Sequence, residues 1–287
     1  MDDPRPYSPE WIRRRLEASS KRIHQGLGQH YLVNPGAVTV IAEACRRLAP
    51  GPLVLEIGAG LGVLTHALLE AGLTVRAVEI EEVSGDILAD TLGKTHGDRF
   101  TLLRGDFLAM EPQRLTGGLG RDFLVCGNLP YNRVGEILLR CLEVFGEAPP
   151  ALVFMMQREV AQKLASPPGR REYGALSVIF QALYLLKPVM NLAPGSFHPP
   201  PKIESTVLSF LPERRPGDLG DWPRFLRVVR ASFGHRRKKI SGALRDSGQF
   251  SPTQLSALKA SRPELMEKRA ENLSWGEFKF LSDGVPD

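Results

Sequence analysis

Three glycines at alternating positions are the first feature of this 287-residue sequence that points to chemistry. Gly58, Gly60 and Gly62 stand in EIGAGLG, after the apolar run PLVLEI and before GVLTHALLEAG, whose apolar residues recur at helical spacing. A loop that binds the pyrophosphate of a dinucleotide spaces its glycines G-x-G-x-x-G, whereas the third glycine here comes one residue earlier. This spacing favours close approach of the backbone to an adenosine without phosphates, as in S-adenosylmethionine.

Two acidic residues follow the glycine loop at the ends of later apolar runs. Glu79, at the end of LTVRAVEI, is placed to accept hydrogen bonds from both hydroxyls of a ribose. Asp106, in GDFL, is placed to accept a hydrogen bond from the amino group of an adenine. Open α/β sheets bind ligands at the carboxyl ends of their strands, so the loop and these two carboxylates are predicted to form one adenosine site.

The segment GNLPYN, residues 127–132, follows the apolar run FLVC and combines turn residues with an aromatic ring. An exocyclic amine of adenine is a poor nucleophile because its lone pair is delocalised into the ring. Asn128 Oδ1 and the Leu129 carbonyl can accept hydrogen bonds from the two N–H groups of such an amine, while Pro130 fixes the turn. Tyr131 offers a flat face on which an extruded base stacks. The predicted chemistry is methyl transfer to an adenine amine, with Asn128 as a positioning group and not a base.

The elements that would hold these residues are short apolar runs alternating with helical patterns. This alternation predicts an α/β fold with a mostly parallel sheet covered by helices on both faces. Strands are expected within 52–60, 73–80, 99–108, 122–128, 151–157 and 202–212, with a β-α-β unit formed around the helix after Gly62.

The chain divides into three parts by composition. Residues 1–27 are expected to be an N-terminal extension that is mobile, although SPEWIRRRL begins like a helix capped by Ser8. Residues 28–212 form the α/β domain. A linker rich in proline, glycine and charge, 213–223, opens a small helical domain that extends to residue 287.

Positive charge is concentrated in that last part. The formal net charge is +5 overall, and the 15 Lys and Arg against 9 Asp and Glu from Arg214 onward give that segment +6. A solvated helical face is the usual explanation for a charge run, but the adjacent cations of HRRKK (235–239) repel one another without an anion nearby. We therefore expect this domain to bind RNA phosphates through six residues: Arg227, Arg230, Arg236, Arg237, Lys238 and Lys239.

Other classes of protein are disfavoured by composition. No apolar run approaches the roughly 20 residues that span a bilayer, and no signal peptide is recognisable, so a cytoplasmic location without membrane contact is expected. The three cysteines suit a reducing compartment. The histidines show no metal-ligand spacing, so no metal is assigned. Nothing indicates an oligomer interface, and a monomer is expected.

Nine segments in order resemble the ribosomal RNA adenine N6-dimethyltransferase family, closest to its small-subunit (16S) branch. The resemblance runs from Gly28 to Phe278. The segments are LGQHYLVN, VLEIGAGLGVLT, AVEIE, GDFL, GNLPYN, QREVAQKL with YGALSV, FHPPPKIES, FGHRRKKISGAL and RAENLSWGEF. The departures are small: position 30 is His where many relatives have Asn, Tyr31 replaces Phe, and Ile203-Glu204 replaces a Val-Asp pair.

The resemblance implies a Rossmann-like methyltransferase domain followed by a small helical domain. It implies that His30 and Leu32 touch the methionine part of S-adenosylmethionine, that Asn128 lies between cofactor and target, and that Tyr131 and Phe197 sandwich the flipped base. The implied reaction dimethylates the N6 amines of two adjacent adenosines in a hairpin loop near the 3′ end of 16S rRNA, late in assembly of the small ribosomal subunit.

Three alternatives stand beside this interpretation. The antibiotic-resistance branch of the same family dimethylates an adenosine of the large subunit. An RNA-binding assembly factor could keep the fold without catalysis, although the intact glycine loop, Glu79 and NLPY favour an enzyme. A nicotinamide-dependent dehydrogenase is disfavoured by the glycine spacing.

Overall fold

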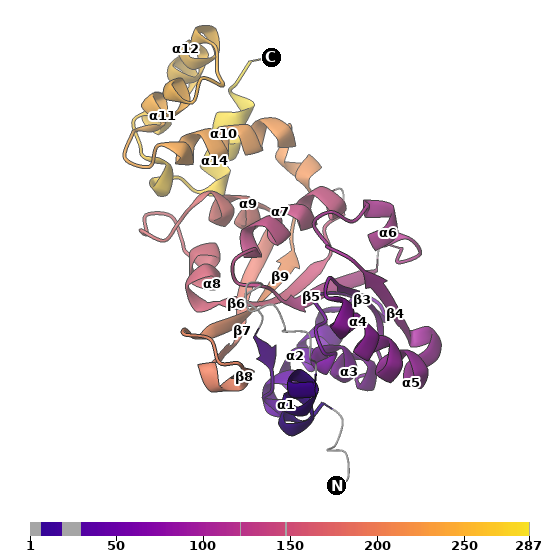
Figure 1. The fold of residues 1–287 in the computed structure, drawn as a ribbon. Coiled ribbons are helices and arrows are strands. Elements are labelled where there is room, and N and C mark those ends of the chain that lie inside the picture. Colours follow the sequence, from indigo (N-terminus) through magenta and orange to yellow (C-terminus); the bar gives the residue numbers. More distant parts are fainter. Residues whose placement is uncertain (1–6, 19–29, 121, 147, 287) are drawn as a thin grey trace. The chain divides into compact units, whose positions relative to one another are not determined.

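The protein forms two compact units in the computed structural model, which describes residues 7–18, 30–120, 122–146 and 148–286 (Figure 1). The first unit comprises Met1–Arg158 and Lys187–Leu211, and the second comprises Glu159–Leu186 and Pro212–Asp287. Residues 1–6 and 19–27 of the expected extension lie outside the described residues.

A seven-stranded sheet with the order β4-β3-β2-β5-β6-β9-β7 forms the centre of the first unit. The strands from β4 to β6 run parallel to one another, and β9 pairs antiparallel with β6. The strands span β2 Leu53–Ile57, β3 Thr74–Glu79, β4 Phe100–Arg104, β5 Phe123–Asn128, β6 Ala151–Gln157, β7 Tyr184–Leu192 and β9 Ser205–Pro212. The predicted α/β fold with a mostly parallel sheet is therefore confirmed.

The β-α-β unit around the glycine loop is also confirmed. Strand β2 leads through the loop into helix α3 (Val63–Glu70), and β3 returns parallel to β2. The register places Glu79 opposite Arg104 of β4, and Asn128 of β5 opposite Met155 of β6. Because neighbouring parallel strands end together, the polar residues at their carboxyl ends share one edge of the sheet.

Helices cover both faces of this sheet, as the alternating side chains of β5 show. Leu124 and Cys126 lie in the core cluster together with side chains from α2, α3 and α4. Phe123 points the other way, and its ring packs edge-to-face against Phe145 of α7 at 5.4 Å between centroids. The helices of this unit are α1 Pro9–Ala18, α2 Pro35–Leu48, α3, α4 Glu82–Leu88, α5 Lys94–His96, α6 Pro112–Thr116 and α7 Val134–Phe145.

Helix α1 is packed, which differs from the mobile extension expected for this region. The Ser8 hydroxyl accepts the Trp11 N–H at 3.1 Å and begins the helix as predicted. Trp11 and Ile12 are then buried at 2% and 0% exposure among core residues of the first unit. Burial of these two apolar side chains stabilises the packing of α1 against the core.

Three strands were not predicted. The two-residue strands β1 (Tyr31–Leu32) and β8 (Phe197–His198) pair antiparallel, with Leu32 opposite Phe197. Strand β7 follows helix α9 (Ala175–Leu183) without a loop and carries Pro188. It is the terminal strand of the sheet, where a proline is tolerated because one side needs no hydrogen bonds.

The second unit is helical, but its boundaries differ from the predicted ones. Residues 159–186 belong to it because α9 packs against α10 and α14. The expected linker is a 3₁₀ turn, Pro216–Leu219, with Leu219 buried, and Asp221 caps α10 by accepting the Arg224 N–H. Its helices are α8 Arg158–Ala165, α9, α10 Trp222–Gly234, α11 Ile240–Asp246, α12 Pro252–Ser261, α13 Pro263–Met266 and α14 Trp275–Asp283.

Within the described part of the chain, no helix is both long enough and apolar enough to cross a lipid bilayer. Cys45, Cys126 and Cys141 are all buried as free thiols.

Candidate active site

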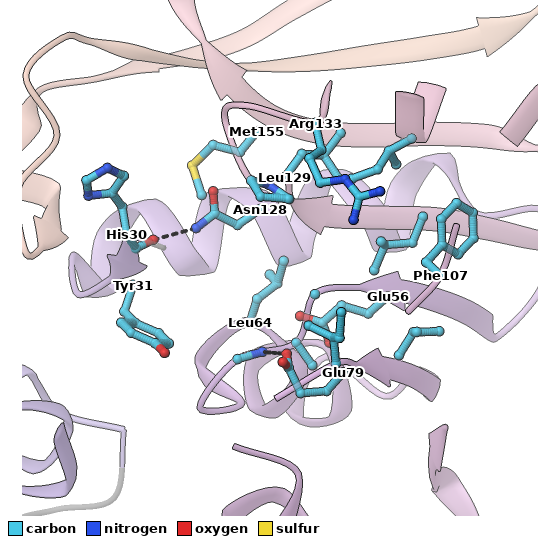
Figure 2. Close-up of a pocket in the computed structure, with 18 of the residues that line it drawn as sticks. His30, Tyr31, Glu56, Leu64, Glu79, Phe107, Asn128, Leu129, Arg133 and Met155 are labelled. Atoms are coloured by element: carbon cyan, nitrogen blue, oxygen red, sulfur yellow. Dashed lines mark hydrogen bonds between the residues drawn. The ribbon is translucent and has the colours of Figure 1, made fainter. Parts of the chain in front are cut away.

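A cavity of about 150 Å³ lies at the carboxyl ends of the parallel strands of the first unit (Figure 2). Its walls include every residue that the sequence analysis assigned to the cofactor and every residue assigned from NLPY. These residues are His30, Leu32, Gly58, Gly60, Glu79, Asp106, Asn128, Leu129, Pro130 and Tyr131. The predicted adenosine site and the predicted target site therefore share one cavity.

The glycine loop is held by the carboxylate of Glu79. Glu79 Oε2 accepts the Gly60 N–H at 2.6 Å, and its Oε1 accepts the Glu81 N–H at 2.8 Å. Burial raises the pKa of this carboxyl, while the backbone donors oppose the shift. Gly60 has a φ of +56°, and a Cβ there would lie 3.1 Å from the Tyr31 ring, so a side chain would close the cradle.

The orientation of the Asn128 amide is fixed by the chain itself. Asn128 Nδ2 donates to the His30 carbonyl at 2.7 Å, as Figure 2 shows. A carbonyl accepts only from the NH₂ end of the amide, so Oδ1 is left as the acceptor of this side chain. Gly127 allows this arrangement because a Cβ there would lie 2.3 Å from the Ile57 carbonyl oxygen of β2.

Tyr131 forms a wall of the cavity together with His30. The two rings lie 5.2 Å apart with a tilt of 35°, and His30 Nδ1 is 2.8 Å from the Pro199 carbonyl. The Tyr131 hydroxyl is hydrogen-bonded to the Ser205 hydroxyl at the start of β9. These contacts anchor the Tyr131 ring at its far end and leave its apolar face to the cavity.

Phe197 is not brought to the cavity, in contrast to the sandwich implied by resemblance. Its side chain is 3% exposed and lies in the core cluster with Tyr31 and Leu32. The pairing of β8 with β1 directs it there. In this structure His30, and not Phe197, is the second ring beside Tyr131.

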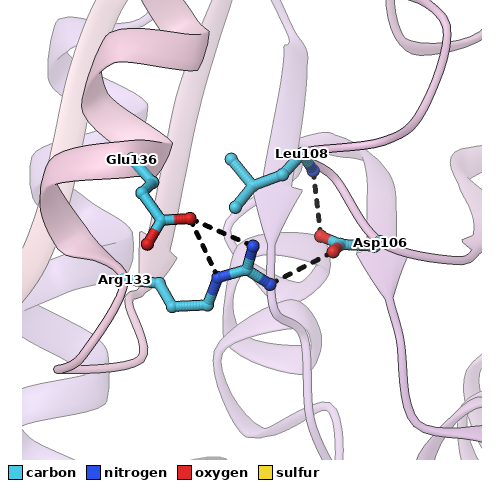
Figure 3. Close-up of polar contacts among 4 residues, drawn as sticks. All are labelled: Asp106, Leu108, Arg133 and Glu136. Carbon is cyan, nitrogen blue, oxygen red and sulfur yellow. Dashed lines mark hydrogen bonds and ion pairs between the residues drawn. The ribbon is translucent and has the colours of Figure 1, made fainter.

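Arg133 lines the cavity and was missed from the sequence, although it follows NLPYN directly. Its Nη1 donates to Asp106 Oδ2 at 3.1 Å, and its Nη2 donates to Glu136 Oε2 at 3.1 Å (Figure 3). Hydrogen bonds to Glu136 and then to Asp106 raise the pKa of the guanidinium. The Arg133 guanidinium is therefore paired with Asp106, the carboxylate that was predicted to accept a hydrogen bond from the adenine amino group.

Comparison with known proteins decides the family. A model of the ribosomal RNA adenine dimethylase family matches residues 20–283. The chain belongs to this family. A dimethylase relative from Anaeromyxobacter dehalogenans, named ribosomal RNA small subunit methyltransferase A, is 38% identical over 277 residues that cover 93% of this chain and 94% of the relative. The protein of the same name from Geobacter sulfurreducens is 36% identical over 267 residues, covering 92% and 95%.

Solved structures agree on the fold of this dimethylase. A dimethyladenosine transferase from Plasmodium falciparum superposes with a TM-score of 0.71 at 22% identity, covering 88% of this chain and 96% of that one. The 23S rRNA methyltransferase ErmE superposes with a TM-score of 0.63 at 23% identity, covering 89% and 99%. At such identities the likeness supports the Rossmann-like methyltransferase fold and not the choice of RNA.

The dimethylase is an S-adenosylmethionine-dependent methyltransferase, and its cavity suits that cofactor. The loop leaves room where a side chain at Gly60 would not. Glu79 and Asp106 place carboxylate acceptors in the cavity lining, and Glu56 of β2 adds a third carboxyl.

Glu56 is the second residue that sequence reasoning left without a role. It is 1% exposed, it lines the cavity, and its Oε2 has no hydrogen-bond partner among the described residues. Burial, with a further contribution from the Glu79 charge, raises its pKa to about 8. A carboxyl with this pKa is mostly protonated at neutral pH.

Possible metal ligands also occur away from the cavity, a cluster that the sequence spacing did not indicate. Ligand atoms of His66, Glu70 and His96 lie within 4.8 Å of one another. Arg99 Nη2 lies 3.2 Å from His96 Nδ1, and it places a positive charge and a competing donor at this cluster. We therefore assign no metal to it.

The six basic residues predicted for RNA differ in how they are held within the second unit. Arg236 donates to the carbonyls of Arg171 and Tyr173 at 2.7 and 3.1 Å. Lys238 pairs with Asp246 and Lys239 with Glu267, while Arg227 stacks over the Phe250 ring. Arg230 and Arg237 are exposed, and neither makes an ion pair with another described residue.

Proposed function

We propose that this dimethylase converts two adjacent adenosines, in a hairpin loop near the 3′ end of small-subunit rRNA, to N6-dimethyladenosine. The observation that carries the proposal is the fixed Asn128 amide beside the Tyr131 ring. The names of the relatives from Anaeromyxobacter and Geobacter support the small subunit as the source of the RNA.

The proposed role of the target site is to position an unreactive amine. Asn128 Oδ1 and the Leu129 carbonyl accept its N–H groups, which favours a pyramidal nitrogen, and Tyr131 stacks on the base. The backbone of Leu129 is held in place because its N–H donates to the Met155 carbonyl at 3.0 Å. His30 contributes its carbonyl to Asn128 and its ring to the wall beside Tyr131.

The proposed cofactor contacts follow from the lining of the cavity. Glu79 accepts the ribose hydroxyls with lone pairs not used by Gly60 and Glu81, and Asp106 accepts the adenine amino group. Leu32 and the loop at Gly58 border the remainder of the cofactor. S-adenosylmethionine, when bound, supplies the methyl group.

The proposed RNA contacts of the second unit come mainly from Arg230 and Arg237, which no internal carboxylate neutralises among the described residues. Arg227, Lys238 and Lys239 contribute charge although each already contacts a neighbouring side chain. Arg236 instead donates to a backbone carbonyl of its own unit. A monomer that acts on the small ribosomal subunit in the cytoplasm completes the proposal.

The test supplies labelled S-adenosylmethionine and the protein to unmethylated small and large ribosomal subunits, and maps the label by mass spectrometry. We expect N6-dimethyladenosine at two neighbouring positions of the small-subunit RNA. Label on the large subunit would transfer the protein to the resistance branch of the family. No label on either subunit, with RNA binding intact, would indicate an assembly factor without catalysis.

A further inference from the structure

We propose that Arg133 is a specificity-determining residue, which makes the adenine end of the cavity accept a purine with a 6-amino group and reject one with a 6-oxo group. This inference rests on the proposed role of Asp106 as the acceptor of the adenine amine. It concerns a residue that touches Asp106 and lines the cavity, one position beyond the NLPYN segment.

The Asp106 carboxylate is held at both of its oxygens. Leu108 N–H donates to Oδ1 at 2.9 Å, and Arg133 Nη1 donates to Oδ2 at 3.1 Å (Figure 3). Each oxygen has a second lone pair, so both still accept a hydrogen bond. A carboxylate fixed at both ends and neutralised by a guanidinium presents only acceptors in a set direction.

Glu136 controls the direction in which Arg133 points. Its Oε2 accepts from Nε at 3.3 Å and from Nη2 at 3.1 Å, one turn along α7 from Arg133. The guanidinium is therefore clamped between two carboxylates, with Nε, Nη1 and Nη2 each donating one hydrogen bond (Figure 3). A guanidinium free to rotate would turn an N–H toward a 6-oxo group and would erase the discrimination.

The two purine edges differ at this point by a donor and an acceptor. A 6-amino group donates to the fixed Asp106 carboxylate, whereas a 6-oxo group would face it acceptor to acceptor. A site that is built to accept a hydrogen bond from a ligand strongly rejects analogues that lack the donor. Exposure of the site to solvent weakens this rejection. With side-chain exposures of 32% for Asp106 and 36% for Arg133, we expect the wild-type protein to prefer the amino form about 100-fold.

The test measures binding and not turnover. Calorimetry gives the affinities of S-adenosylhomocysteine and S-inosylhomocysteine for the wild-type protein and for Arg133→Met and Glu136→Gln. Arg133→Met should lower the preference for the adenosyl ligand about tenfold, mainly by lowering the affinity for that ligand. Glu136→Gln should lower it about threefold, since the clamp is loosened and not removed.

The same helix offers matched controls. Arg140 and Glu143 form the same i,i+3 pair on α7, at 3.1 Å, away from the cavity lining. Arg140→Met and Glu143→Gln should keep the wild-type preference. An unchanged preference in Arg133→Met would overturn the proposal. Tighter binding of the adenosyl ligand in that variant would also overturn it, because Arg133 would then be a competitor for Asp106.

Asp106→Asn separates failure of this inference from failure of the proposed cofactor site. An amide can turn its NH₂ toward a 6-oxo group, so the preference should collapse in this variant. A collapse with Asp106→Asn but not with Arg133→Met would remove only the role of Arg133. An unchanged preference with Asp106→Asn would show that Asp106 does not read the base, and both proposals would fall together.

Discussion

The cavity of the first unit and the basic segment of the second unit, residues 227–239, hold their polar side chains in opposite ways. Around the cavity, Glu79 and Asn128 are fixed by backbone groups at 2.6 to 2.8 Å, and each keeps lone pairs for the ligand contacts that we propose. In the basic segment, Arg236 donates hydrogen bonds to backbone carbonyls of its own unit, whereas Arg230 and Arg237 are exposed to solvent. The cavity residues are thus held by the backbone, whereas the two exposed arginines on which we propose that RNA binding depends are not.

This difference has consequences for mutation. A residue that the backbone positions for chemistry has no substitute nearby, so its loss is expected to affect turnover steeply. A phosphate contact is one of several equivalent charges, and its loss subtracts a small increment from affinity. Four predictions test this contrast, beginning with the largest expected effect.

Asn128→Ala removes the acceptor that the His30 carbonyl orients. We expect single-turnover methylation to slow about 10²- to 10³-fold, the usual cost of losing a preorganised positioning group, while RNA affinity stays near normal. Asn128→Asp should be nearly as slow, because an ionised carboxylate cannot donate to the His30 carbonyl. Methylation at the normal rate by either variant would remove the positioning role.

Phe197→Ala tests the placement of this ring in the core. Truncation of a buried phenylalanine is expected to lower the free energy of unfolding by about 3 to 5 kcal/mol, measured by denaturant titration. Tyr131→Leu should lower the unfolding free energy by less, about 1 to 3 kcal/mol, because the buried Ser205 hydroxyl loses its partner. It should also weaken use of the RNA substrate, since base stacking contributes about 1 to 3 kcal/mol.

Phe197→Leu keeps most of the core volume and serves as the control. It should methylate at close to the wild-type rate once folded. A large loss of activity in this variant, with little loss of stability, would restore Phe197 to the target site.

Most of the cavity was predictable because it is built from local signals. The alternating glycines, Glu79 at a strand end and NLPY after a buried run each mark a place where the backbone turns at the edge of a parallel sheet. The core position of Phe197 and the cavity position of Arg133 were not predicted, because both depend on partners distant in sequence. The β1–β8 pairing directs Phe197 inward, and Asp106 draws Arg133 into the cavity. Pairings of this kind leave no periodic pattern.

Glu56 is expected to make the free energy of unfolding depend on pH. Its folded pKa of about 8 lies above its ordinary value of 4.5, so the folded state binds the proton more tightly than the unfolded state. The stabilising contribution is complete below pH 4.5 and is lost as the pH rises through about 8, by on the order of 5 kcal/mol. Denaturant titrations from pH 4.5 to 9 measure this fall.

Glu56→Gln mimics the protonated carboxyl and should flatten most of that fall. The buried Glu79 contributes in the same direction, so a smaller slope should remain. An identical slope in wild type and Glu56→Gln would show that Glu56 is not the titrating group.

Arg230→Glu with Arg237→Glu tests the basic segment at the positions that no described carboxylate neutralises. RNA affinity should fall about tenfold at 0.15 M salt, and the slope of log affinity against log salt should decrease by roughly 1.5, because each lost phosphate contact removes about 0.7 to 0.9. Cofactor affinity should not change.

Arg47→Glu with Lys187→Glu, both exposed on the first unit, carries the same change in net charge and is the control. Equal losses in the two double variants would mean that net charge, and not the basic segment, attracts the RNA. A loss confined to Arg230→Glu with Arg237→Glu would localise the attraction there and complete the contrast with the cavity.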